Sequence, residues 1–300
     1  MKEMQISDPL VSVIIPFLNA ELFLKNTIES VLAQEHKTWE IILIDDGSTD
    51  KSTVIAKHFA KEYSGQIFYL EHEGHANKAA AASRNLGLSK VRGELVAFLD
   101  ADDIWLPKKL KEQIAIFKKY PEVKLVCEAS KYWYSWENAD LADVITPVGV
   151  AADQIYCPPT LVTNLYPLGK GSAPCPSGAI VARSVFETVI GFEESFIGKN
   201  APFEDIAFFN KIYLHECVYV SSSCNNLYRQ RSNSVVGEMK NFGYYNSAKH
   251  FYLQWLKKYL KTHHINNNNL RFLLWKTMLA NKHPFLSKII NKIDRVFSKT

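Results

Sequence analysis

Short apolar runs alternate with longer amphipathic stretches along the first 127 residues of the chain. Within residues 21–34, for example, Leu24, Ile28, Val31 and Leu32 recur at helical spacing. The short runs predict strands at Val11–Pro16, Glu40–Ile44, Ile67–Leu70, Leu95–Leu99 and Val123–Val126. Helices are predicted between them, at residues 21–34, 50–63, 79–90 and 107–120. This alternation is typical of an α/β fold, in which helices cover both faces of a Rossmann-like, mostly parallel sheet.

The pattern changes after Cys127. Residues 131–178 are aromatic and contain several prolines, which favours loops and short strands. Later elements are predicted as strands at Gly178–Val181 and Val218–Val220 and a helix at Asp205–Leu214, followed by a largely helical C-terminal extension. We therefore divide the chain into residues 1–127, 128–239 and 240–300.

Composition indicates a folded globular protein. Of the 300 residues, 47% are hydrophobic and 12% are aromatic, which excludes a disordered or collagen-like chain. No window holds 18 uninterrupted apolar residues, and the N-terminus lacks the apolar core of a signal peptide, so neither a membrane span nor a leader is expected. The five cysteines form no C-x-x-C pair and are expected to be reduced thiols in a cytoplasmic protein.

The net charge of +4 hides a strong asymmetry along the chain. Residues 240–300 contain 12 Lys and Arg but a single acid, Asp294, and so carry a formal charge of +11. Residues 1–239 contain 23 Lys and Arg against 30 Asp and Glu, a formal charge of −7. A mildly acidic body with a strongly basic end suggests that the two parts have different tasks.

Acidic residues follow two of the predicted strands. Asp45-Asp46-Gly47-Ser48 comes after the second strand, and Asp100-Ala101-Asp102-Asp103 comes after the fourth. Ligands of open α/β sheets bind at the carboxyl ends of the strands. Clustered carboxylates repel one another, and a hard cation such as Mg²⁺ or Mn²⁺ relieves that repulsion. The alternative is that Asp103 caps the next helix and the other acids face solvent.

Two further motifs carry suitable chemistry. Arg84, in Ser83-Arg84-Asn85, offers a guanidinium for a nucleotide or its diphosphate, although a single arginine on a helix is usually just exposed. Glu204 and Asp205 begin a predicted helix, where a carboxylate can serve as a general base or merely complement the helix dipole.

Taken together, these motifs resemble those of the family 2 glycosyltransferases, which are inverting nucleotide-sugar transferases with the GT-A fold. The resemblance covers residues 10 to about 235 and includes Val11–Asn19, Ser30–Gln34, Asp45–Asp50, Ser83–Asn85 and Phe98–Asp103. It implies transfer of a sugar from a nucleotide donor, expected to be a UDP-sugar, to a glycan or glycolipid acceptor in polysaccharide or cell-surface glycan synthesis. It also implies that Mn²⁺ or Mg²⁺ is the cofactor.

The resemblance implies roles for individual residues. Those expected to bind the donor are Pro16, Leu18, Asn19, Asp46, Arg84, Asp100, Ala101 and Arg231. Asp102 would hold the metal, Asp205 would be the general base and Glu204 would lie on the acceptor side. The chain departs from the family pattern in two places: Arg231 stands where many relatives carry His, and the segment between Gly74 and Arg84 is a few residues longer than usual.

Two other functions remain compatible with the sequence. A metal-dependent nucleotidyltransferase also needs carboxylates, a metal and a nucleotide, although the chain lacks the Gly- and Lys-rich phosphate loop expected near its N-terminus. The second is a non-catalytic nucleotide-sugar-binding protein.

The basic C-terminal extension contains two apolar stripes at helical spacing. One lies within residues 285–299, and the other consists of Tyr252, Trp255, Leu256, Tyr259 and Leu260. Lysines flank both stripes, and Arg295 also flanks the first, which predicts peripheral contact with the anionic inner face of the plasma membrane. The alternative is that the stripes pack on the catalytic domain. No nucleic-acid partner is expected, because no recognised motif accompanies the charge.

Overall fold

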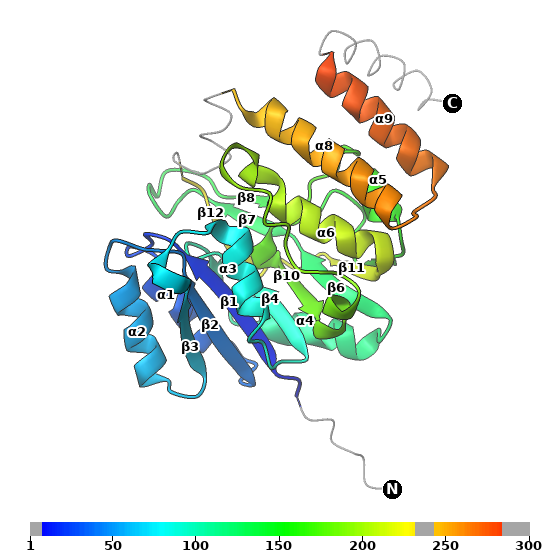
Figure 1. Ribbon diagram of the computed structural model, residues 1–300. Helices are drawn as coiled ribbons and strands as arrows, with labels where there is room; N and C mark the ends of the chain where they lie inside the picture. The colour runs from blue at the N-terminus through cyan, green and yellow to red at the C-terminus, as the bar shows by residue number, and fades with distance from the viewer. Residues whose placement is uncertain (1–7, 232–242, 284–300) are drawn as a thin grey trace, which may run out of the picture.

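The computed structural model describes residues 8–231 and 243–283, which form a layered α/β fold (Figure 1). Its main sheet has eight strands in the order β3-β2-β1-β4-β10-β6-β11-β9, and a smaller sheet has the order β5-β12-β7-β8. The strands are β1 (Val11–Phe17), β2 (Trp39–Asp45), β3 (Ile67–Glu71), β4 (Leu95–Phe98), β5 (Ile104–Trp105), β6 (Val123–Glu128), β7 (Ser130–Trp133), β8 (Val144–Thr146), β9 (Gln154–Tyr156), β10 (Ala179–Ala182), β11 (Cys217–Ser221) and β12 (Asn226–Arg229).

Helices connect and cover these strands. The α-helices are α1 (Leu24–Leu32), α2 (Ser52–Glu62), α3 (Ala79–Leu88), α4 (Lys109–Lys119), α5 (Thr160–Asn164), α6 (Glu204–His215), α8 (Tyr245–Thr262) and α9 (Asn268–Lys282). Short 3₁₀ helices are η1 (Glu73–His75), η2 (Pro176–Gly178), η3 (Arg183–Glu187) and η4 (Gly198–Phe203). The predicted α/β fold with a mostly parallel sheet and a C-terminal helical extension is thereby confirmed.

The main sheet has a hydrophobic core on each face. Alternate side chains of a strand point to opposite faces, so Ile14 of β1 joins one core while Val13 and Ile15 join the other. The first core includes residues of α6, α8 and α9, and the second includes residues of α1, α2 and α4. Every residue of β1 is buried, as expected for a central strand covered on both sides.

The later strands enter the sheet in a way that the sequence pattern did not predict. β10 lies between β4 and β6 and is antiparallel to both, so the sheet combines strands from both sides of residue 127. The two-residue strand β5, directly after Asp103, was not predicted either. It pairs with β12 and thereby brings the residues after β12 next to the acidic loop after β4.

The apolar stripe on α8 packs on the protein body. Tyr252 and Leu256 are fully buried, and the Tyr252 ring stacks on Phe203 with 5.4 Å between the ring centroids. The side-chain amide of Asn210 on α6 donates a hydrogen bond to the Tyr252 hydroxyl. For this stripe, packing on the domain is the correct alternative and insertion into a membrane is wrong. The other predicted stripe, in residues 285–299, lies outside the described residues.

Within residues 8–231 and 243–283, no helix combines the length and apolar character needed to cross a bilayer. All five cysteines lie in these ranges and are free thiols.

Replacing Tyr252 by alanine should reduce the free energy of unfolding by about 3–5 kcal/mol, because a buried aromatic ring and its hydrogen bond to Asn210 are lost. Chemical denaturation at equilibrium measures the change. Phe272→Ala is the matched control, since Phe272 is 56% exposed on α9 and its loss should cost less than about 1 kcal/mol. Equal effects of the two substitutions would show that α8 is not part of the cooperative fold.

Candidate functional site

The ends of β1 and β2 form one side of the candidate site. The backbone N–H of Asp46 donates to the Phe17 carbonyl at 2.9 Å, and the Asn19 side-chain oxygen accepts from the backbone N–H of Thr49 at 2.8 Å. Pro16 is buried in β1, whereas the Leu18 side chain is 44% exposed beyond the end of the strand. These contacts hold the two loops together and leave Leu18 open to a ligand.

The segment between β3 and α3 folds back over this edge. Asp46 Oδ1 accepts from the backbone N–H of Lys78 at 2.7 Å, and Asp46 is only 4% exposed. His72 Nε2 lies 3.7 Å from the same oxygen and 2.9 Å from the Ser83 hydroxyl, which neighbours Arg84. His72 therefore links the loop after β2 to α3.

Gly47 makes this close approach possible. Its φ of +84° lies in the left-handed region, and a Cβ atom there would come within 2.9 Å of the backbone of His75 and Asn77. Gly47 is therefore needed so that the segment between Gly74 and Arg84 can pack against the site.

Arg84 joins the acidic loop after β4 to the Glu204 and Asp205 pair at the start of α6. From α3, its Nη2 lies 2.7 Å from Asp100 Oδ1 at the end of β4, and its Nη1 contacts Glu204 Oε1 at the start of α6. Its guanidinium also lies over the Phe192 ring, 5.2 Å from the ring centroid. The side chain of Arg84 is 5% exposed, so the alternative of a solvent-exposed helix arginine is wrong.

Burial and pairing set the charges of this group. Burial by itself disfavours the charged form of Arg84, but Glu204 and Asp100 outweigh it and raise the Arg84 pKa. Burial raises the pKa of Glu204, and Arg84 partly opposes that rise. Glu204 Oε2 is buried without a hydrogen-bond partner in the described part of the chain, so its capacity to accept a hydrogen bond is unused there.

Asp205 directly follows Glu204, and its pKa is suited to a general base. Its Oδ1 accepts from the backbone N–H of Ile206 at 2.6 Å. Burial raises the pKa of Asp205 to about 7, and the nearby Glu204 carboxylate contributes to the rise. A carboxyl group with a pKa near neutrality can accept a proton from a substrate hydroxyl and release it again.

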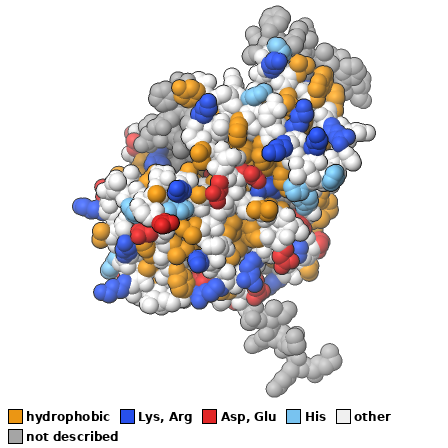
Figure 2. Space-filling model, in the orientation of Figure 1, with side chains coloured by type: hydrophobic (Ala, Val, Ile, Leu, Met, Phe, Trp, Pro, Cys, Tyr) orange, Lys and Arg blue, Asp and Glu red, His pale blue; other side chains and the backbone are white. Residues whose placement is uncertain are grey.

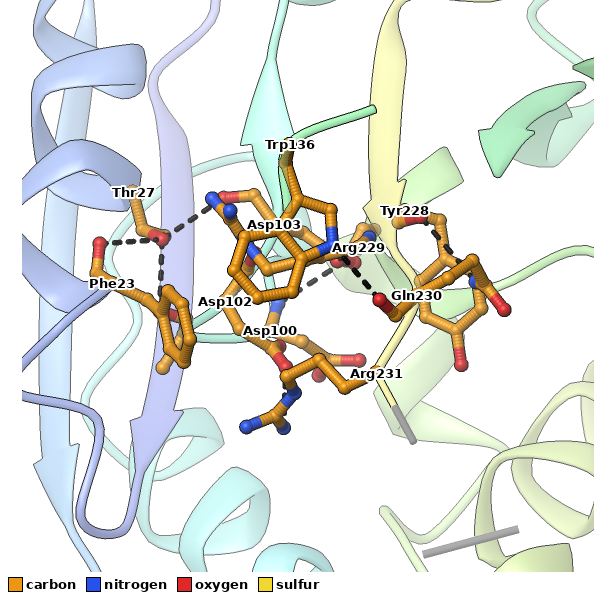
Figure 3. A network of polar contacts seen from close by, with 12 residues as sticks. Phe23, Thr27, Asp100, Asp102, Asp103, Trp136, Tyr228, Arg229, Gln230 and Arg231 are labelled. Atoms are coloured by element: carbon orange, nitrogen blue, oxygen red, sulfur yellow. Dashed lines mark hydrogen bonds and ion pairs between the residues drawn. The ribbon is translucent and has the colours of Figure 1, made fainter. Parts of the chain in front are cut away.

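Asp102 and Arg231 form an ion pair on the other side of Asp100. The Arg231 Nη2 atom lies 2.6 Å from Asp102 Oδ2, and burial raises the Asp102 pKa while Arg231 opposes this (Figure 3). Within the described ranges, three or more Asp, Glu, His or Cys side chains are nowhere placed to enclose a metal ion. A cation held by Asp102 would therefore complete its shell with water and substrate phosphates, as Mg²⁺ and Mn²⁺ commonly do. The oxygen donors present fit such a cation.

Asp103 has a structural role that differs from helix capping. It is fully buried, with its carboxylate accepting from the Ser177 hydroxyl at 2.6 Å and from the Arg229 backbone N–H at 3.0 Å. The Thr27 hydroxyl lies 2.9 Å from the carbonyl oxygens of both Ala101 and Asp103. The predicted alternative of a cap is wrong, since α4 begins only at Lys109. Asp103 instead joins the acidic loop to β12.

Arg229 reinforces the same loop from within an aromatic cluster. Its Nε donates to the Asp102 carbonyl at 2.7 Å, and its guanidinium lies 4.7 Å from the ring centroids of Phe23 and Trp136 (Figure 3). It also lies 4.5 Å from the centroid of the Trp133 ring. Neither Arg229 nor Trp136 was predicted from sequence. The sequence offered only weak indications of their roles. Arg229 follows a short strand-like run, and Trp136 lies in the aromatic segment for which the hydrophobic pattern predicted no definite element.

The structure places the candidate residues in two adjoining groups. Asn19 and Asp46 lie at the ends of β1 and β2 and reach α3 through His72. The second group meets around Arg84 and the acidic loop after β4, and consists of Arg84, Asp100, Ala101, Asp102, Glu204, Asp205 and Arg231.

Comparison with known proteins identifies the family of the chain. The model of the family described as "Glycosyl transferase family 2" matches residues 12–189. EpsE of Bacillus subtilis (strain 168), named as a glycosyltransferase, is 42% identical over 120 residues, which are 40% of this chain and 42% of EpsE. TuaG of the same organism, named as a teichuronic acid biosynthesis glycosyltransferase, is 43% identical over 107 residues, or 35% of this chain and 41% of TuaG. The matched part thus spans about two-fifths of these relatives.

Solved structures share the fold at low sequence identity. TarS 1-349 of S. aureus covers 92% of this chain and 72% of its own, with a TM-score of 0.64 at 17% identity. The mannosyltransferase PcManGT from Pyrobaculum calidifontis, solved with GDP-Man and Mn²⁺, covers 91% of this chain and 71% of its own, with a TM-score of 0.56 at 15% identity. The chain therefore has the GT-A fold and belongs to glycosyl transferase family 2.

Proposed function

We propose that the protein is an inverting glycosyltransferase that moves a sugar from a UDP-sugar to a glycan or glycolipid acceptor. The observation that carries the proposal is the Arg84 bridge, because it places the acids at the start of α6 beside the acidic loop after β4. Membership of the family supports it, and so does the structure of TarS 1-349 in complex with UDP-GlcNAc, whose TM-score with this chain is 0.60 at 20% identity. That structure covers 81% of this chain and 65% of its own.

The donor would lie across the ends of β1, β2 and β4. Pro16, Leu18, Asn19 and Asp46 would line the pocket for the base and ribose, and Asp100 and Ala101 would meet the ribose from the loop after β4. Arg84 would lie against the same nucleotide. In this assignment residues 1–127 supply most of the donor site, and residues 128–239 supply the acceptor side.

Asp102 would hold Mn²⁺ or Mg²⁺, with Arg231 close enough to contact the diphosphate of the donor. Bound there, the cation would stabilise the negative charge that develops on the leaving diphosphate. Arg231 supplies a second positive charge at the same place, since its guanidinium can form paired hydrogen bonds with phosphate oxygens.

Asp205 would act as the general base. It would accept the proton of the acceptor hydroxyl while that oxygen bonds to the anomeric carbon of the sugar. The bond between the anomeric carbon and the diphosphate oxygen breaks, and UDP leaves with its electron pair. A single displacement of this kind inverts the anomeric configuration and needs one base, whereas Glu204, held by Arg84, would help to orient the acceptor.

Asp205→Asn should lower the rate of sugar transfer by about 10²–10⁴-fold, because an amide cannot accept the proton. UDP affinity should change less than about twofold, since no contact of Asp205 places it in the donor pocket. Product formation and isothermal calorimetry with UDP measure the two quantities. Glu62→Gln, an exposed carboxylate on α2, is the control and should leave both unchanged. Normal transfer by the Asp205 variant would remove it from the role of base.

The pH profile should report the ionisation of Asp205. Its pKa of about 7 means that kcat/KM should rise about tenfold per pH unit below 7 and level off above it, because only the carboxylate form accepts a proton. The residual activity of Asp205→Asn should lack this step. A profile for the native enzyme that is flat between pH 5 and 8 contradicts the assignment.

Asp102→Ala should abolish the dependence of UDP affinity on Mn²⁺, because it removes the carboxylate proposed to hold the cation. Arg231→Ala should weaken UDP binding about tenfold while keeping the response to Mn²⁺. Arg183→Ala, an exposed arginine on η3, is the control. Calorimetry with and without Mn²⁺ tests all three variants, and unchanged affinity of Asp102→Ala in Mn²⁺ refutes the metal assignment.

A further inference from the structure

The two C-terminal helices α8 and α9 form a surface groove of about 1000 Å³. The groove is bounded by one stripe of each helix, running from His250 to His264 and from Arg271 to Lys282. The Asn281 side-chain amide donates to the Asn246 carbonyl at 3.2 Å, and Asn267 caps the start of α9 by accepting from the Leu270 N–H at 2.9 Å. The first contact joins the end of α9 to the start of α8, and the second stabilises the start of α9.

The walls of the groove are positively charged. Lys257 and Lys261 line it from α8, and Arg271 and Lys282 line it from α9. All four are exposed, and residues 243–283 contain no Asp or Glu to neutralise them. In Figure 2, Lys, Arg and His side chains gather with hydrophobic ones over α8 and α9, where no acidic side chains are seen among the described residues. Such a surface attracts an anion.

The remaining lining is largely apolar. Leu260 and Leu274 lie between the charged walls but are only 4% exposed, whereas Met278 and Leu279 are half-buried and Trp275 is 59% exposed. Leu260 is shared by this groove and the buried stripe of α8, whereas Tyr252 and Leu256 of that stripe do not line the groove. An exposed aromatic residue beside apolar and cationic groups is typical of surfaces that rest in the headgroup region of a membrane.

We propose that the groove between α8 and α9 binds an anionic phospholipid and so docks the protein on a membrane surface. The phosphate would meet the cations of the walls, and the acyl chain would cover Trp275, Met278 and Leu279. A nucleic acid would also satisfy the cations, but it would leave this apolar surface uncovered. Residues 284–300 carry four Lys and Arg and one acid, so charge opposes their binding in the same groove.

The start of α8, which precedes the groove, packs beside the proposed acceptor side. The Tyr245 ring at the start of α8 lies 5.5 Å from the Phe203 ring, and Phe203 directly precedes Glu204. A protein bound to a membrane through α8 and α9 would therefore keep the acid pair near that surface. Lipid binding itself does not depend on sugar transfer, so the two proposals can fail separately.

Flotation of the full-length protein with lipid vesicles tests the proposal. Wild type should bind vesicles that contain phosphatidylglycerol and phosphatidylcholine and should not bind phosphatidylcholine alone. Lys257→Glu/Lys261→Glu should reduce the affinity for the anionic vesicles at least about thirtyfold, because each cation near an anionic surface contributes about 1 kcal/mol. Trp275→Ser should reduce it about tenfold through loss of apolar contact.

Matched variants distinguish an effect of the groove residues from an effect of net charge alone. Lys61→Glu/Lys258→Glu makes the same change in net charge outside the groove and should cost less than about fivefold, and Phe272→Ser is the exposed aromatic control on α9. Lys288→Glu/Lys292→Glu tests the C-terminal residues. UDP binding by calorimetry shows that each variant is folded.

Several results would overturn the proposal. These are failure of the wild type to float with anionic vesicles, equal losses for the groove and control variants, and loss confined to Lys288→Glu/Lys292→Glu. Equal competition by inorganic phosphate would indicate a phosphate site without lipid contact. Stronger binding to a single-stranded oligonucleotide than to anionic vesicles would favour a nucleic-acid surface instead.

Discussion

The buried guanidinium of Arg84 is the interaction on which the rest of the site depends. A charge with a 5% exposed side chain is costly unless it is paired, and Arg84 is paired with Asp100 and Glu204 from two different parts of the chain. It thereby holds α3, the end of β4 and the start of α6 in one arrangement. The same contacts bury Glu204, and its carboxylate in turn helps to raise the pKa of Asp205 toward neutrality.

The three arginines near the acidic loop have distinct roles that follow from their surroundings. Arg84 is enclosed and joins elements of the fold, whereas Arg229 lies among aromatic rings and holds the loop backbone through the Asp102 carbonyl. Arg231 is 32% exposed and pairs with the Asp102 carboxylate, which is itself 21% exposed. The cations thus neutralise a cluster of carboxylates whose repulsion would otherwise destabilise the loop.

The C-terminal helices pack on the body of the protein with one face and form the surface groove with another. One face of α8 packs on η4 and α6 through Tyr252 and its neighbours, and so adds to the core beside the acid pair. Another face forms the cationic groove with α9. The high positive charge of this region is therefore concentrated on the solvent-exposed side, because buried positions exclude unpaired lysines.

Apart from the two-residue strand β5, the sequence by itself determined the strands and α-helices of the first 127 residues, the acidic motifs and the family resemblance, because short-range periodicity and local motifs carry that information. It did not determine that β10 runs antiparallel between β4 and β6, or that Asp103 binds Ser177 and the backbone of β12. It left open whether Arg84 was exposed and whether the α8 stripe was buried. Only the tertiary structure decided these points, because each depends on contacts between residues far apart in the chain, such as Arg84 and Glu204, whose pairing leaves no periodic signal in the sequence.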